Sequence, residues 1–202
     1  MKKYSFSSIS EYFNKNYFKF LALSLVLLFI NDLAVVSANK SRSEELDNDK
    51  KPSVVKDVDL RRYQGTWYEI ARLPNMFERK LKCITATYTL RQDGRISVLN
   101  RGNYITDPVK ESSVDGSAWI PDPENPGKLK VRFFWPFSGD YWILYLDKDY
   151  KYALVGDPKF KFLWILSRDK FMDEETYRML LNIATEKGYD VSSVIRVKHD
   201  CN

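Results

Sequence analysis

The chain has 202 residues, of which 44% are hydrophobic and 29% charged, so its composition is that of a globular protein with a buried core. Aromatic residues make up 15%, a content that favours β-structure. The formal net charge is +5, but basic and acidic residues are interspersed, which argues against nucleic acid as a partner. His199 is the only histidine, so a multi-histidine metal site and most histidine-based hydrolysis are excluded, and we expect neither metal nor cofactor.

The N-terminal segment has the pattern of an export signal. Residues 20–30 form an apolar run that follows several lysines and is shorter than the roughly 20 residues of a membrane-spanning helix. Val36-Ser37-Ala38 then offers small residues for cleavage, so we predict a signal peptide over residues 1–38 and export to the periplasm or the extracellular space. No cysteine follows the run closely, which excludes lipid attachment to a mature N-terminal cysteine. An uncleaved membrane anchor is the alternative.

Residues 39–56 are rich in charge and poor in apolar side chains, so we expect a disordered leader before a domain over residues 57–202. The domain contains two cysteines, Cys83 and Cys201. In an exported chain an even number of cysteines suggests a bridge, which would tie the C-terminal tail to an early strand. Two free thiols, or a catalytic thiol at Cys83, are the alternatives at this point.

Short apolar or alternating runs, each ended by turn residues, predict eight strands in the domain. Asp93-Gly94 is a strong hairpin signal, and residues 121–127 (PDPENPG) form a loop. The predicted strands span residues 66–73, 83–90, 95–104, 114–120, 129–135, 141–146, 152–155 and 162–166. Because the connections are short, strands adjacent in sequence pair antiparallel, and eight such strands close into an up-and-down barrel with room for one small ligand.

One helix follows the last barrel strand. Asp173 is its candidate N-cap and Gly188 stands at its C-terminal end, while Tyr177, Leu180, Leu181 and Ala184 recur at helical spacing. Residues 141–146 are apolar on both faces, so we expect the helix to cover the outside of the barrel near them. The predicted fold class is therefore all-β, an eight-stranded antiparallel up-and-down barrel with a C-terminal α-helix packed outside.

The predicted first strand, Gly65-Thr66-Trp67-Tyr68-Glu69-Ile70-Ala71-Arg72, resembles the G-x-W opening strand of the lipocalin family. YALVGD at 152–157 and LWILSR at 163–168 resemble later motifs of that family, with a general likeness to its bacterial, outer-membrane type members and to the apolipoprotein D group. The resemblance covers about residues 58–201 and implies the same barrel and a small lipophilic ligand. It also implies a disulfide between Cys83 and Cys201.

Three motif residues have a structural interpretation. Gly65 permits a tight turn at the barrel floor, Trp67 is large enough to plug the narrow end, and Arg168 can lay its guanidinium on the indole face. The resemblance likewise implies structural roles for these residues. We therefore expect a closed end built from this trio.

The inward-facing side chains predicted from strand alternation are mostly apolar, with a few hydroxyls, one amide and flat rings, and we expect no charge deep inside. Strand alternation contributes Phe133 and Tyr145 to the candidate ligand-binding residues. The resemblance implies pocket-lining positions for the others, which are Tyr88, Asn100, Tyr104, Tyr141 and Trp164. Tyr104 replaces a basic residue that the resemblance leads one to expect, so recognition of an acid group is not implied at that position.

These features predict a binding protein, not an enzyme, that transports or stores a fatty acid, a lysophospholipid or a similar lipid, with membrane lipid maintenance as one role. Loop cations could accept an anionic head group at the rim, with a merely solvated surface as the alternative. Met76 and Phe77 on the first mouth loop are candidates for a peripheral membrane contact or a ligand contact, with local packing of the pair as the alternative. The alternatives are an isomerase with Cys83 as its thiol nucleophile and a ligand-free interaction protein whose barrel is filled by rings. Nothing in the sequence fixes an oligomeric state.

Overall fold

The computed structural model describes residues 51–201, so the predicted signal peptide and most of the predicted leader lie outside the described residues. The domain from Pro52 onward is one compact unit. Its elements, in chain order, are α2 (Leu60–Tyr63), β1 (Gly65–Arg72), β2 (Leu81–Leu90), β3 (Ile96–Tyr104), β4 (Glu111–Trp119), β5 (Lys128–Phe134), β6 (Phe137–Leu146), β7 (Tyr152–Gly156), β8 (Leu163–Ser167), α3 (Glu174–Glu186) and β9 (Ile195–Arg196). None of the helices in the described range is both long and apolar enough to cross a bilayer.

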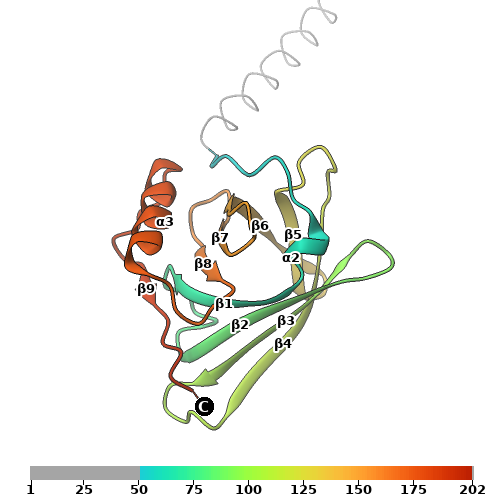
Figure 1. The fold of residues 1–202 in the computed structure, drawn as a ribbon. Helices are drawn as coiled ribbons and strands as arrows, with labels where there is room; N and C mark the ends of the chain where they lie inside the picture. Colours follow the sequence, from blue (N-terminus) through green and yellow to red (C-terminus); the bar gives the residue numbers. More distant parts are fainter. Residues whose placement is uncertain (1–50, 202) are drawn as a thin grey trace, which may run out of the picture. The chain divides into compact units, whose positions relative to one another are not determined.

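The first eight strands form a closed antiparallel ring (Figure 1). Each of them pairs with its neighbour in sequence, and β1 closes the ring by pairing with both β2 and β8. The short β9 adds to the free part of β1 through Ala71 and Arg72. Every predicted strand overlaps an observed one, so the predicted meander and barrel are confirmed.

The hairpin between β2 and β3 shows how local chemistry sets the register of the barrel. Gly94 has a positive φ of 77°, a backbone conformation that residues with a Cβ rarely adopt. The Arg95 backbone N–H donates to Asp93 Oδ1 at 3.1 Å, and the Arg91 N–H donates to the Arg95 carbonyl at 2.8 Å. Together these contacts close the turn that the Asp93-Gly94 signal predicts.

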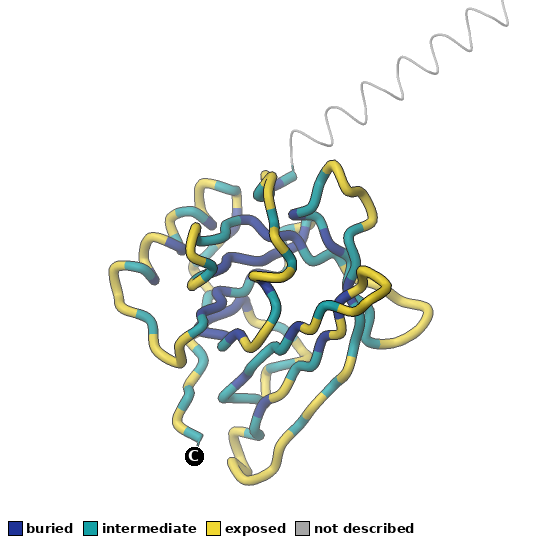
Figure 2. Tube along the Cα trace, turned by 45° about the vertical axis from the view of Figure 1, so that its right-hand side comes forward, coloured by how far each residue is buried: buried dark blue, intermediate teal, exposed yellow. Residues whose placement is uncertain are grey.

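Two apolar cores lie on opposite faces of the barrel wall, and Figure 2 shows the buried segments running through the ring of strands. The inner core includes Trp67, Ile143 and Val155. The outer core lies between the wall and α3, where Tyr177, Leu180 and Ala184 pack with Trp142 and Leu144. The helix therefore covers the part of β6 that is apolar on both faces, as predicted.

α3 begins where the sequence places its N-cap. The Asp173 carboxylate accepts from the Thr176 backbone N–H at 2.8 Å and from the Thr176 hydroxyl at 2.7 Å. Two glutamates in the first turn add favourable charge at the positive end of the helix dipole. At the other end Gly188, with φ of 94°, donates its N–H to the Thr185 carbonyl.

The closed end of the barrel is built around Trp67. The Arg168 guanidinium lies over the indole with its Cζ 3.8 Å from the ring centroid, which is the stacking expected from the sequence. The indole Nε1 donates to the Tyr63 carbonyl at 2.8 Å, on the short helix α2 that sequence reasoning missed. The side chain of Asp59 caps α2, so an N-cap residue was a usable signal for this turn of helix.

Residues 52–56, which the sequence places at the end of a disordered leader, pack on the barrel instead. Pro52 is buried, and the Val55 N–H donates to the Ile143 carbonyl at 2.9 Å. Gly127 lies against the backbone of Val55, where a Cβ would clash. Two adjacent valines supply both apolar area and a strand-like hydrogen bond, which explains why this short piece is ordered despite its charged neighbours.

Candidate functional site

A cavity of about 90 Å³ lies inside the barrel. Its lining is mostly apolar and consists of Tyr63, Glu69, Glu78, Ile84, Thr85, Ala86, Tyr88, Ile96, Val98, Asn100, Ala118, Leu129, Val131, Phe133, Asp140, Tyr141, Trp164 and Leu166. Small-molecule pockets usually measure about 300–1,000 Å³, so this one is narrow. It still far exceeds the roughly 10–15 Å³ that one water needs, so the rings do not fill the barrel completely.

Five of the seven predicted ligand-binding residues line this cavity: Tyr88, Asn100, Phe133, Tyr141 and Trp164. They come from five different strands, which follows from the inward-facing position that each strand contributes. Tyr104 and Tyr145 do not line it, so both expectations are corrected.

Tyr145 does not line the cavity because β6 is irregular at this point. The pairing of β6 with β7 shifts between Ile143 and Tyr145, so the strict alternation of faces breaks there. As a result Leu144 and Tyr145 both belong to the outer core under α3, while Leu146 returns to the inner one. Sequence alternation alone carries no sign of such a bulge.

Tyr104 ends β3 near the start of the loop to β4. Its ring lies under the Lys110 ammonium, with Nζ 5.3 Å from the ring centroid, and its backbone N–H donates to the Lys110 carbonyl at 3.1 Å. Tyr104 therefore supports the loop that ends in Lys110 and is not part of the cavity lining.

Three tyrosines join their hydroxyl groups at the inner end of the cavity. The Tyr141 hydroxyl lies 2.7 Å from that of Tyr63 and 2.9 Å from that of Tyr88. Burial is the main cause that raises the pKa of each of these phenols, so all three stay neutral. The triad thus gives the cavity a polar but uncharged floor beside Trp67.

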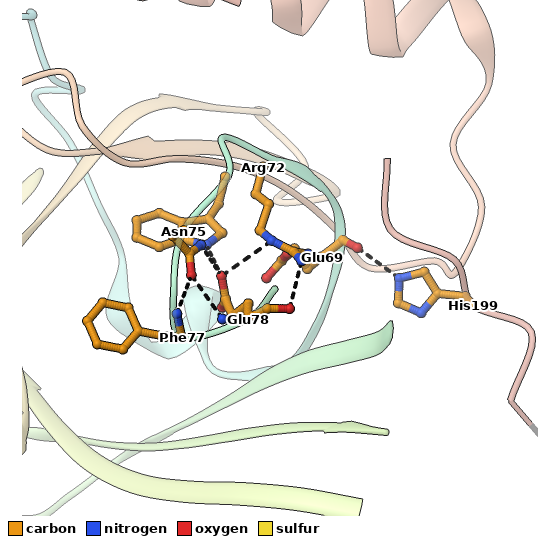
Figure 3. Close-up of polar contacts among 7 residues, drawn as sticks. Glu69, Arg72, Asn75, Phe77, Glu78 and His199 are labelled. Atoms are coloured by element: carbon orange, nitrogen blue, oxygen red, sulfur yellow. Dashed lines mark hydrogen bonds and ion pairs between the residues drawn. The ribbon is translucent and has the colours of Figure 1, made fainter. Parts of the chain in front are cut away.

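A buried charge cluster of Glu69, Arg72 and Glu78 stands at the other end of β1 (Figure 3). Glu69 and Arg72 are each 3% exposed, which contradicts the expectation of no charge deep inside. Arg72 Nη1 donates to Glu69 Oε1 at 2.7 Å, and its Nη2 donates to the Glu78 carbonyl at 2.8 Å. The charge is tolerated because the guanidinium pairs with both carboxyl groups, although Arg72 Nε itself is buried without a hydrogen-bond partner among the described residues.

The loop after β1 brings Glu78 to this cluster. Asn75 Oδ1 accepts from the backbone N–H groups of Phe77 and Glu78, and its Nδ2 donates to Glu78 Oε2. The Trp164 Nε1 also donates to Glu78 Oε2, at 3.1 Å, so the loop is tied to the cavity wall. Arg72 Nε lies 3.8 Å from the same carboxylate oxygen.

Two carboxyl groups share one guanidinium in this cluster, and both are taken out of water. Burial is the largest cause that raises the pKa of Glu69 well above its ordinary value, and the neighbouring Glu78 raises it further. Arg72 opposes the shift without cancelling it. The cluster therefore holds a proton under conditions in which an exposed glutamate is ionised.

Sequence reasoning missed Glu69 as a lining residue, although a signal existed. Glu69 follows Trp67 by two positions in the same strand, so alternation places both side chains on the inner face. The expectation of no charge deep inside leaves such a residue out, whereas Arg72, three residues later, supplies a partner for it.

The loops beyond this cluster expose large apolar side chains. In an up-and-down barrel alternate connections share one end, so the loops β1–β2, β3–β4 and β5–β6 lie together. We call their exposed apolar residues the apolar rim: Met76, Phe77, Ile105, Val109, Phe134, Trp135 and Phe137. Exposed cations on loops of the same end are Arg79, Lys80, Lys110, Lys159 and Lys161.

The rim is linked to the cavity by stacked rings. The Phe77 and Phe162 ring centroids lie 6.5 Å apart, and Phe162 stacks on Trp164 at 5.6 Å with an interplanar angle of 6°. Because Trp164 lines the cavity, an aromatic path runs from the exposed rim to the interior.

Cys83 and Cys201 form a disulfide with an S–S distance of 2.11 Å. The Cys201 N–H also lies 3.1 Å from Cys83 Sγ. Neither sulfur is part of the cavity lining, and a bonded thiol cannot act as a nucleophile or bind a metal, so the isomerase alternative loses its only candidate residue.

Comparison with known proteins defines the class to which this barrel belongs. The lipocalin-like domain family matches residues 58–199, and the chain belongs to that family of proteins that bind small hydrophobic ligands. It is 46% identical over 154 residues to temperature-induced lipocalin-1 of Arabidopsis thaliana, covering 72% of this chain and 81% of that protein. It is 44% identical over 146 residues to outer membrane lipoprotein Blc of Escherichia coli K12, covering 72% and 82% respectively.

More distant relatives agree with this assignment. Apolipoprotein D of Macaca fascicularis is 34% identical over 179 residues, which is 84% of this chain and 93% of that protein. Among solved structures, insecticyanin of Manduca sexta aligns with a TM-score of 0.58 and 27% identity, covering 73% of this chain and 83% of that one.

Proposed function

We propose that this protein binds a small lipophilic ligand in the barrel cavity and transports or stores it, with membrane lipid maintenance as its role. The observation that carries the proposal is the largely apolar cavity inside the barrel. Trp67 and Arg168 close one end of the barrel, and the apolar rim lies at the other end. Fatty acids, lysophospholipids and similar lipids supply the apolar chain that such a cavity buries.

Tryptophan fluorescence provides a direct test with the neutral probe N-phenyl-1-naphthylamine. Trp164 lines the cavity, whereas Trp135 is 82% exposed on the apolar rim. We expect saturable probe binding with quenching of tryptophan emission in the wild type and in Trp135→Phe. In Trp164→Phe the quenching should fall strongly, because the indole nearest to the bound probe is gone.

A larger loss of quenching in Trp135→Phe than in Trp164→Phe would place the probe on the rim and contradict binding in the barrel. Absence of saturable binding by the wild type, both before and after delipidation in organic solvent, would refute the carrier function. Mass spectrometry of the solvent extract identifies any lipid that copurifies with the protein.

We propose that the protein works after export, with residues 1–38 removed as a signal peptide. The disulfide supports an oxidising compartment, and two of the relatives are named outer membrane lipoprotein and apolipoprotein. Sequencing the N-terminus of the protein recovered from its source should give Asn39 as the first residue. A chain that retains residues 20–30 would instead establish an uncleaved anchor.

We also propose a peripheral membrane contact through the apolar rim. Trp135 and Phe137, 82% and 78% exposed, stand at the tip of one hairpin, and rings of this kind partition into the bilayer interface. The loop cations at the same end suit an anionic surface. A barrel that docks on its mouth would receive its ligand directly from the bilayer.

Flotation with vesicles of phosphatidylcholine and phosphatidylglycerol tests this contact. The double variant Trp135→Ser/Phe137→Ser should lose most of the binding, because it removes two rings from the rim. Phe171→Ser is the matched control, since Phe171 is 80% exposed but follows β8 at the opposite end of the barrel. Equal loss in both variants, or none in either, would contradict docking through the rim.

A further inference from the structure

The charged side chains that line the cavity are all acidic. Glu69, Glu78 and Asp140 contribute carboxyl groups, and the lining includes no lysine, arginine or histidine from the described part of the chain. Asp140 has a cation of its own, since Lys130 Nζ lies 2.8 Å from its Oδ1. Glu69 and Glu78 share the guanidinium of Arg72. A ligand inside the barrel therefore meets carboxyl oxygens and no unengaged cation.

The polar hydrogens of the lining are largely used within the protein. Trp164 Nε1 donates to Glu78, and the Tyr141 hydroxyl is shared with those of its two tyrosine neighbours. Asn100 differs, because its side chain makes no hydrogen bond with the described residues and its Oδ1 is buried without a partner. An unpaired buried amide oxygen costs about 1–3 kcal/mol, and a ligand hydroxyl, which can donate to Oδ1 and accept from Nδ2, recovers more of this than a carboxylate, which can only accept.

We propose that the cavity selects lipophiles whose polar group is a neutral or positively charged hydrogen-bond donor, such as an alcohol, an amide or a protonated amine. Ionised fatty acids bind more weakly than these lipids. This inference rests on the proposed carrier function and narrows its ligand class. It departs from the expectation that rim cations accept an acid head group, because those cations lie on exposed loops and outside the cavity lining.

Electrostatics explains the discrimination. A carboxylate that enters the barrel loses its hydration and approaches Glu69 and Glu78 without a free cation to receive it. Burial and the neighbouring Glu78 raise the pKa of Glu69, so a further negative charge beside this cluster meets the same cost. An alcohol or ammonium group brings its own hydrogens to the same oxygens, so its desolvation is compensated.

Three probes with the same chain and different polar groups test the proposal: decanol, decylamine and decanoic acid at neutral pH, below their aggregation limits. We expect decanol and decylamine to bind at least tenfold more tightly than decanoate, measured by calorimetry or by displacement of N-phenyl-1-naphthylamine. Equal or tighter binding of decanoate would overturn the inference and leave the carrier function intact. If none of the three probes binds, the carrier function itself fails, and the inference fails with it.

Two variants of lining residues test whether Glu78 and Asn100 cause the difference in affinity between decanol and decanoate. Glu78→Gln removes a negative charge but keeps an oxygen that can accept from Trp164 and Asn75, so decanoate should gain affinity at least threefold relative to decanol. Asn100→Leu removes the unpaired amide, so decanol should bind more weakly than to the wild type. Glu175→Gln, an exposed substitution on α3, is the matched control and should change neither. Unchanged relative affinities in both lining variants would overturn the inference.

Discussion

The guanidinium of Arg168 covers the indole of Trp67 and at the same time binds the chain that precedes it. Its Nη1 donates to the Thr66 carbonyl at 2.9 Å, and its Nη2 donates to the carbonyls of Arg62 and Gln64 at 2.9 Å each. One side chain from the end of β8 thus holds the turn between α2 and β1 and closes the barrel floor.

We predict that Arg168→Ala lowers the free energy of unfolding by roughly 2–4 kcal/mol, because several charge-assisted hydrogen bonds and the stacking on Trp67 disappear together. Arg168→Lys should recover little, since an ammonium lacks the planar fork that reaches several carbonyls. Arg95→Ala, on the exposed β2–β3 turn, is the control and should stay near wild type. Denaturant unfolding measures all three, and a small loss in Arg168→Ala would contradict this role.

The disulfide makes a second prediction. It links residues 118 positions apart, and a loop of that size loses about 4–5 kcal/mol of denatured-state entropy in the chain-entropy model. The double variant Cys83→Ser/Cys201→Ser should therefore be less stable by roughly 2–5 kcal/mol, as measured by denaturant unfolding.

The same double variant should bind N-phenyl-1-naphthylamine like the wild type at low temperature, since neither cysteine lines the cavity. The wild type treated with reductant should match the variant in stability. A folded variant that lost probe binding would show that Cys83 contributes to the site.

The architecture of the barrel could be predicted from the sequence because its determinants are local. Turn residues such as Asp93-Gly94 end each strand, and short connections leave little choice of topology. The helix α3 could be predicted because its N-cap, Asp173, and its apolar stripe both lie within one short segment of the chain. The interior was harder, because cavity residues depend on register irregularities and on partners distant in sequence.

Two residues illustrate that limit. Strict alternation predicts Tyr145 in the cavity, but a bulge after Ile143 turns it toward α3. Alternation places Glu69 on the inner face, but the tolerance of its charge depends on Arg72 and on Glu78, which a separate loop carries to the wall. Such compensation is decided by three-dimensional contacts, so single-strand patterns reveal the position of a side chain but not whether its charge is tolerated.

Glu69 predicts a specific pH dependence of stability. In the unfolded chain its carboxyl titrates near 4.5, whereas in the folded protein burial and Glu78 raise its pKa well above that value. The folded state therefore binds more protons over this interval, and the contribution of Glu69 to the free energy of unfolding falls as pH rises from about 4.5 through the folded pKa.

Denaturant unfolding at a series of pH values, from mildly acidic to neutral, measures this contribution. Relative to the wild type, Glu69→Gln should become progressively more stable as pH rises, because glutamine has no proton to lose. Glu175→Gln should show no such trend. A difference between Glu69→Gln and wild type that is constant with pH would contradict the raised pKa.

The tyrosine triad predicts a cost for losing its central hydroxyl. Tyr141→Phe leaves the hydroxyls of Tyr63 and Tyr88 without their shared partner, and each unsatisfied buried group costs about 1–3 kcal/mol. We expect a loss of roughly 1–3 kcal/mol in the free energy of unfolding, with the barrel intact by circular dichroism. Tyr104→Phe is the control, since no hydrogen bond of its hydroxyl occurs within residues 51–201. Equal stability of the two variants would show that the triad is not a structural network.

Filling the cavity provides the last prediction. Ala118 lies on β4, is 2% exposed and lines the cavity opposite Val131 of β5, so a phenylalanine at this position projects its ring into the free space. We expect Ala118→Phe to abolish saturable binding of N-phenyl-1-naphthylamine, with a change in stability of no more than about 1–3 kcal/mol from overpacking. Ser97→Phe adds the same ring at an exposed position of the neighbouring strand β3 and should leave binding intact. If Ala118→Phe folds and still binds the probe with wild-type affinity, the ligand lies outside the barrel, because the space between β4 and β5 can no longer hold it.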